Sequence, residues 1–195
     1  MMETGALKFA YELDGRELAP FAGFEELNTV RQEMRRLGLL GVDENGIAFG
    51  NASLRDGASF YITGSGTGSL DSLGSQEYAK VVAWDFERNW VRCEGRVIAS
   101  AESLTHAAVY ASDSDVRVVV HGHDEALWHG LLERGRATQS KVLYGTPEMA
   151  REVKRLFRET DVRTTRAFAM GGHRDGIVAF GRDFREALAA LVPTG

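Results

Sequence analysis

The chain has 195 residues, of which 44% are hydrophobic and 26% charged, and its formal net charge is −5. This length suits one well-packed core and is short for two domains. The acidic balance argues against nucleic acid and anionic membranes as partners, because both bind basic surfaces. Cys93 is the single cysteine, so no intrachain disulfide can form, and no window approaches the roughly 20 apolar residues of a membrane helix. We therefore expect a cytoplasmic protein.

The hydrophobic pattern predicts helices and strands that alternate along the chain. Between Phe24 and Leu40, apolar residues recur at spacings of three and four, as in an amphipathic helix. In chain order, the pattern then predicts strands at Ile47–Arg55, Ser59–Thr63, Lys80–Phe86 and Trp90–Cys93, a helix at Ala101–Ser112, a strand at Val116–Val120, helices at Asp124–Leu132 and Thr146–Glu159, strands at Arg166–Met170 and Ile177–Phe180, and a helix at Arg182–Leu191. Several neighbouring strands are joined by turns too short for a helical crossover. The sequence therefore predicts a mixed α/β protein whose sheet is largely antiparallel, with helices packed on its faces.

Histidines follow two apolar strands. His121 and His123 are separated by one glycine, and since side chains alternate along a strand, both project to the same side. His173 follows Met170-Gly171-Gly172 in the same way. Three imidazoles with an open fourth position are typical of a catalytic zinc site, although imidazole also binds other divalent transition metals. Taken alone, a His-x-His pair is also consistent with hydrogen-bonded surface histidines.

Two other features have both a functional and a structural interpretation. The segment Thr63-Gly64-Ser65-Gly66-Thr67-Gly68 exposes backbone amides and small hydroxyls that suit an anion, or it is simply a surface loop. Glu102 stands at the start of a predicted helix. There it either stabilises the helix N-terminus or acts as a general acid and base beside the metal.

Several motifs together, in this order, resemble the class II aldolase/adducin-head family, which includes fuculose-phosphate aldolase. The motifs are Gly50-Asn51-Ala52-Ser53-Leu54-Arg55, Ile62-Thr63-Gly64-Ser65-Gly66, Ser100-Ala101-Glu102 with His106, His121-Gly122-His123, Tyr144 to Ala150, and Gly172 to Gly181. The resemblance covers about Phe24 to Leu191. We expect residues 1–21 to form an extension outside the family match and residues 22–195 to form a single domain.

The resemblance implies a three-layer α/β/α fold around a mostly antiparallel sheet. It implies that His121, His123 and His173 hold zinc or another divalent metal, and that Glu102 is the catalytic acid and base. It also implies a homo-oligomer, usually a cyclic tetramer, that acts on a small carbonyl or sugar substrate. The family's usual reaction is the reversible aldol cleavage of a ketose phosphate.

The family's phosphate contacts fall on Asn51, Thr63, Gly64 and Ser100, but one family position differs in this chain. Phosphate-binding members typically have Ser-Ser-Glu where this chain has Ser100-Ala101-Glu102, so one hydroxyl is missing. A hydrogen bond to a charged group is worth about 1.5–3 kcal/mol, and its loss weakens the case for a phosphorylated substrate. The basic residues considered for the pocket are Arg55 and Arg174.

The leading hypothesis is a zinc-dependent aldolase-like lyase that makes or breaks a carbon–carbon bond. A ketose-phosphate dehydratase of the methylthioribulose-phosphate type and a metal-dependent decarboxylase are alternatives on the same site. An epimerase is less favoured, because related epimerases usually have an aspartate at the position of Glu102. A non-catalytic adducin-like binding module would be expected to have lost the ligands that this chain retains.

Overall fold

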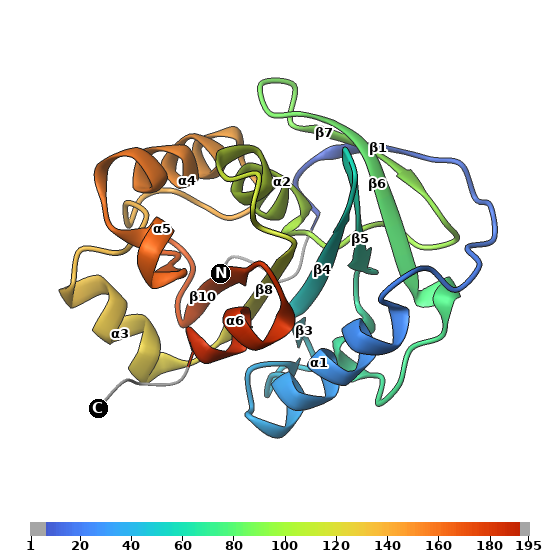
Figure 1. The fold of residues 1–195 in the computed structure, drawn as a ribbon, viewed down its shortest axis with the longest axis horizontal. Helices are drawn as coiled ribbons and strands as arrows, with labels where there is room; N and C mark the ends of the chain where they lie inside the picture. Colours follow the sequence, from blue (N-terminus) through green and yellow to red (C-terminus); the bar gives the residue numbers. More distant parts are fainter. Residues whose placement is uncertain (1–6, 192–195) are drawn as a thin grey trace.

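The computed structural model describes residues 7–191, and its centre is an eight-stranded sheet (Figure 1). The strands lie in the order β1-β7-β6-β5-β4-β8-β10-β9. Their bounds are β1 (Ala10–Leu13), β4 (Asn51–Asp56), β5 (Ser59–Thr63), β6 (Tyr78–Asp85), β7 (Trp90–Glu94), β8 (Val118–His123), β9 (Ala167–Ala169) and β10 (Gly176–Gly181). Every neighbouring pair is antiparallel except β1 and β7, which are parallel. The prediction of a mostly antiparallel sheet is confirmed.

Helices cover both faces of this sheet and give two separate hydrophobic cores. On one face, α2 (Ser103–Ser112) and α4 (Pro147–Glu159) pack side by side, and the short α5 (Val162–Thr165) follows α4 (Figure 1). On the other face lie α1 (Phe24–Arg36), α3 (Glu125–Glu133) and α6 (Phe184–Ala189). The two cores arise because side chains of each strand alternate between the faces. The predicted mixed α/β fold with helices on both sides of the sheet is therefore present.

The segment predicted as one strand from Ile47 to Arg55 is interrupted at Gly50. Before the glycine, β3 (Ala48–Phe49) pairs with β2 (Gly41–Val42) in a separate two-stranded sheet. Gly50 has a φ of 82°, and a Cβ there would lie 2.9 Å from the Leu39 carbonyl oxygen. Only a glycine adopts this conformation so close to another backbone without strain. The break directs Asn51 into the large sheet.

The N-terminal segment contributes β1, a strand that the sequence analysis did not predict. It pairs with β7 in a register that places Ala10 opposite Trp90 and Leu13 opposite Cys93. Its residues are mostly exposed, so they lack the alternation by which a half-buried strand is recognised. Residues 1–6 of the predicted extension lie outside the described residues, and the division into residues 1–21 and 22–195 stays a prediction.

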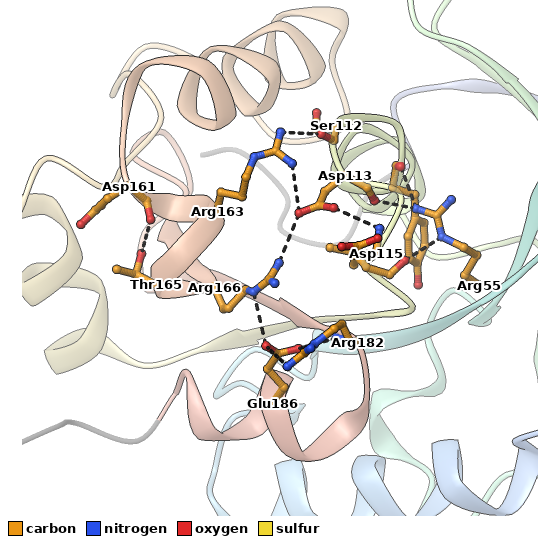
Figure 2. Close-up of polar contacts among 12 residues, drawn as sticks. Arg55, Ser112, Asp113, Asp115, Asp161, Arg163, Thr165, Arg166, Arg182 and Glu186 are labelled. Carbon is orange, nitrogen blue, oxygen red and sulfur yellow. Dashed lines mark hydrogen bonds and ion pairs between the residues drawn. The ribbon is translucent and has the colours of Figure 1, made fainter.

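An ion-pair cluster joins the end of α2 to α5 and α6 (Figure 2). The buried Asp113 carboxylate accepts Arg163 at 3.2 Å and Arg166 at 3.3 Å. Arg55 donates from Nε to the Val116 carbonyl at 2.7 Å and from Nη2 to the Asp113 carbonyl at 3.0 Å. Arg55 therefore satisfies backbone carbonyls at and just beyond the end of α2, and the expectation that it lies at the pocket is wrong.

Among the helices of residues 7–191, none combines the length and the apolar character that crossing a membrane requires.

Candidate metal centre

The three predicted metal ligands meet at one end of the sheet. His121 and His123 belong to β8 and share the face of Val119, which packs into the core formed with α2 and α4. His173 lies in the turn between β9 and β10. One ligand atom from each of the three rings lies within 4.8 Å of the others, and the Nε2 atoms of His123 and His173 are 3.0 Å apart. The i, i+2 spacing and the strand-end glycines thus bring the three imidazoles together.

Gly172 allows the third histidine to approach. A Cβ at this position would lie 2.0 Å from the Val142 carbonyl oxygen, well inside any real contact. The turn therefore packs against the segment before α4 only because residue 172 has no side chain. This close packing fixes the position of His173 against β8.

The environment keeps the three imidazoles neutral. Burial is the main cause that lowers the pKa of each, and the neighbouring His123 lowers the pKa of His121 and of His173 further. The pKa of His173 falls to about 3. The Nδ1 of His121 lies 3.0 Å from the Ile177 carbonyl oxygen, so a proton donated there leaves Nε2 free to bind a metal. Three neutral imidazoles at this spacing form a suitable donor set for a divalent transition metal.

Glu102 lies beside the histidines, at the residue before α2. Glu102 is 4% exposed and makes no capping hydrogen bond to the helix. Instead it accepts a hydrogen bond from the Thr105 hydroxyl at 2.8 Å. Burial raises the pKa of Glu102 to about 7, although Thr105 and Lys8 act in the opposite direction. Such a carboxyl group can both donate and accept a proton near neutral pH.

The three histidines and Glu102 line one pocket. The predicted residues that line it are Asn51, Gly64, Ser100, Glu102, His121, His123 and His173, together with the glycine-rich loop from Ser65 to Gly68. Thr63 does not line the pocket: it is buried, and its hydroxyl accepts a hydrogen bond from the Ala52 amide nitrogen at 3.4 Å. The buried Oδ1 of Asn51 has no hydrogen-bond partner among the described residues and is available to a ligand.

Two residues near the pocket were not assigned a role from the sequence. Tyr144 lines the pocket, with its ring centroid 4.8 Å from that of His173. It stands at the start of the motif before α4, which could have drawn attention to it. The Nζ of Lys8 lies 3.4 Å from the centroid of the Tyr144 ring. No motif surrounds Lys8 in the sequence, and only the fold brings it here.

The basic residue Arg174 was expected near the pocket, and the structure places it elsewhere. Its side chain is 79% exposed and faces Glu125 at 3.4 Å. Within the described part of the chain, the lining of the pocket contains no lysine or arginine. An anionic ligand would therefore meet backbone amides and small polar side chains.

The chain matches the family described as Class II Aldolase and Adducin N-terminal domain over residues 29–193. Among solved structures, the L-fuculose-1-phosphate aldolase from Thermus thermophilus is 22% identical, with a TM-score of 0.59 and 85% of each chain covered. Another L-fuculose 1-phosphate aldolase is 20% identical, with a TM-score of 0.65 over 89% of this chain and 82% of that one. A sugar-phosphate aldolase from Thermotoga maritima is 15% identical, with a TM-score of 0.62 over 85% of this chain and 87% of that one. Identities this low show a shared fold. No curated protein matches the chain.

Proposed function

Because the chain belongs to the class II aldolase and adducin N-terminal domain family, we propose that it is a metal-dependent aldehyde-lyase. Its substrate in this proposal is a small hydroxylated carbonyl compound. The observation that carries the proposal is the meeting of three neutral imidazoles and a buried carboxyl group in one pocket. A non-catalytic binding module would not need this complete set.

In the proposed reaction, His121, His123 and His173 hold zinc or another divalent transition metal. When bound, such an ion supplies Lewis-acid polarisation of the substrate's carbonyl and hydroxyl oxygens. The Glu102 carboxylate takes the proton from the hydroxyl group next to the bond that breaks. As that hydroxyl carbon becomes a carbonyl, the electron pair of the carbon–carbon bond stays with the other fragment. Glu102 then returns the proton to that fragment, so one carboxyl group serves both steps.

Asn51, Gly64 and Ser100 would bind the polar or anionic end of the substrate. The unpartnered Asn51 Oδ1 would accept a hydrogen bond from a substrate hydroxyl, and the backbone amides of the glycine-rich loop in the pocket lining would suit an anionic group. Thr63 would act indirectly, because its hydroxyl accepts a hydrogen bond from the Ala52 amide, next to Asn51. Since Ala101 also lines the pocket and has no hydroxyl, a non-phosphorylated hydroxy-ketone is included among the substrates proposed. A cytoplasmic cyclic homotetramer, as the family resemblance implies, remains part of the proposal.

The first experiment measures metal content in protein purified without chelator. We expect about one zinc ion per chain, lost in His123→Ala because one of three ligands is gone. His129→Ala is the matched control, because His129 packs against Trp128 on α3 and is not a member of the histidine cluster. Absence of metal from the purified protein, with no uptake on reconstitution, would contradict the proposal and favour the binding module.

The second experiment identifies products from ketose phosphates and free hydroxy-ketones. Two carbonyl fragments indicate a lyase, one dehydrated ketone indicates the dehydratase, and release of carbon dioxide indicates the decarboxylase. Glu102→Gln should keep its metal and lower kcat at least about 100-fold, because the amide cannot carry the proton. A variant with unchanged kcat would remove Glu102 from the mechanism.

A further inference from the structure

Lys8 brings a buried positive charge to the edge of the candidate site, from outside the residues that match the family. Its Nζ is fully buried and has no hydrogen-bond partner among the described residues. The ammonium lies over the face of the Tyr144 ring, 3.4 Å from the centroid. An ammonium has three donors, and burying them unpaired is costly unless nearby charge compensates. The position of this group therefore requires a physical explanation.

The backbone holds Lys8 in place. Its carbonyl accepts a hydrogen bond from Asn89 Nδ2 at 2.6 Å, and the Ala10 amide donates to the Asn89 carbonyl at 2.9 Å. Between them, Phe9 is 6% exposed and packs into the same core as α2 and α4. The pairing of β1 with β7 continues this anchoring. Lys8 is thus fixed by the fold.

The charged and titratable groups around Lys8 belong to the candidate site. Burial lowers the pKa of Lys8, and the Glu102 carboxylate acts in the opposite direction. Lys8 in turn lowers the pKa of Glu102 and of His173. Glu102 otherwise faces Thr105 from its own helix and shares the pocket with the histidines of β8 and of the β9–β10 turn. Within residues 7–191 the pocket lining has no lysine or arginine, and Lys8, over the Tyr144 ring at the pocket edge, is the basic side chain that lowers the pKa of this carboxyl group.

We propose that Lys8 is a positioning residue of the active site: its ammonium opposes the charge of the Glu102 carboxylate and holds the Tyr144 ring beside His173. The inference rests on the proposed function, in which Glu102 must carry a negative charge while it waits for substrate. It assigns a catalytic purpose to the segment that precedes the family domain. Lys8 acts through Glu102 and Tyr144, and it does not itself touch the reacting atoms.

The first test is a double-mutant cycle on metal-free protein, which needs no substrate. Urea unfolding at pH 8 is measured for wild type, Lys8→Met, Glu102→Gln and the double variant. We expect Lys8→Met to raise the unfolding equilibrium constant at least about 10-fold more in the wild-type background than in Glu102→Gln, because only the wild type retains the opposing carboxylate. Coupling below about 2-fold would overturn the inference. Should Lys8→Met fail to fold, Lys8→Gln replaces it in the same cycle.

The second test measures exchange of the carbon-bound hydrogens of dihydroxyacetone and of dihydroxyacetone phosphate with solvent deuterium. Lys8→Met should lower kcat at least about 10-fold with KM changed less than about 2-fold, and Lys8→Arg should restore part of the rate. Lys154→Met is the matched control, because the Lys154 Nζ lies 4.3 Å from the centroid of the Phe86 ring, on an aromatic face that does not line the pocket. Zinc content should stay at the wild-type value throughout.

The two tests separate the two proposals. Strong coupling without any exchange or cleavage would contradict the lyase while keeping the Lys8–Glu102 charge pair. Turnover by the wild type, with kcat of Lys8→Met unchanged, would keep the lyase and overturn the role of Lys8.

Discussion

At the scale of single residues, the histidine cluster is prepared for a metal by its own electrostatics. Isolated histidines are half protonated near pH 6.5 and must lose protons before they bind. Burial holds the pKa of His121, His123 and His173 below that value, and repulsion from His123 lowers the pKa of the other two further. The ligands are therefore already neutral when the ion arrives.

This neutrality predicts a weak pH dependence of zinc affinity. Three histidines of ordinary pKa would lose about 50-fold in affinity between pH 7.5 and pH 6, because each becomes mostly protonated. For this protein we expect a loss of only a few-fold over the same range, measured by competition with a metal-sensitive chromophore. A loss near the full 50-fold or so would show that the imidazoles are ordinary titrating groups.

Glu102 predicts a pH-dependent stability in the metal-free protein. Its pKa is about 7 when folded and near 4.5 as a free side chain, so between these values the folded state binds more protons than the unfolded one. Stability from the protonated carboxyl is fully present below pH 4.5 and is lost as the pH rises through 7. Glutamine is never charged, so Glu102→Gln should be more stable than wild type at pH 8, by up to about 3 kcal/mol, and similar to it at pH 4. Urea unfolding at both pH values checks this, and equal stability at pH 8 would mean that the carboxylate is not desolvated.

At the scale of secondary-structure elements, the cluster around Asp113 connects three elements that are distant in sequence. Asp113 ends α2, whereas Arg163 and Arg166 belong to the α5 turn just before β9 (Figure 2). Arg166 also faces Glu186 of α6 at 3.5 Å. The cluster thereby joins helices from both faces of the sheet.

Removing the central carboxylate should destabilise the fold without affecting the metal. Asp113→Ala leaves the 18%-exposed Arg166 side chain without its nearly buried partner, and we expect a loss of about 2–3 kcal/mol in the free energy of unfolding. Asp71→Ala is the control, because its ion pair with Arg35 is 94% exposed on the aspartate side and should change stability by less than about 0.5 kcal/mol. Chemical denaturation measures both, and similar small losses would show that the cluster contributes no more than a surface pair.

The elements that were predicted well are those whose own residues show a clear hydrophobic pattern. The apolar spacing of α1 and the continuous valines of β8 reflect burial that each element achieves by itself. The break at Gly50 and the strand β1 depend on contacts with distant segments, Leu39 in one case and β7 in the other. No local pattern reports such contacts.

At the scale of the whole molecule, the order of motifs predicted the fold and the histidine cluster. It did not predict which basic side chains lie near the pocket. The ligands could be found because each follows a recognisable strand. Lys8 lies over the Tyr144 ring at the edge of the pocket only because β1 joins the sheet beside β7. The same folding places Arg55, which was expected at the pocket, among the carbonyls at the end of α2 instead.

The position of β1 at the edge of the sheet affects the order in which the protein loses activity and unfolds. Among the described strands, β1 has a neighbour on one side only, and its residues are mostly exposed. We therefore expect its backbone hydrogen bonds to be among the first to open in native-state hydrogen exchange. Local unfolding of β1 would move the Lys8 ammonium away from Tyr144, while the strands that carry the histidines stay folded. As denaturant concentration rises, we then expect activity to fall before the protein unfolds globally and before the zinc is released.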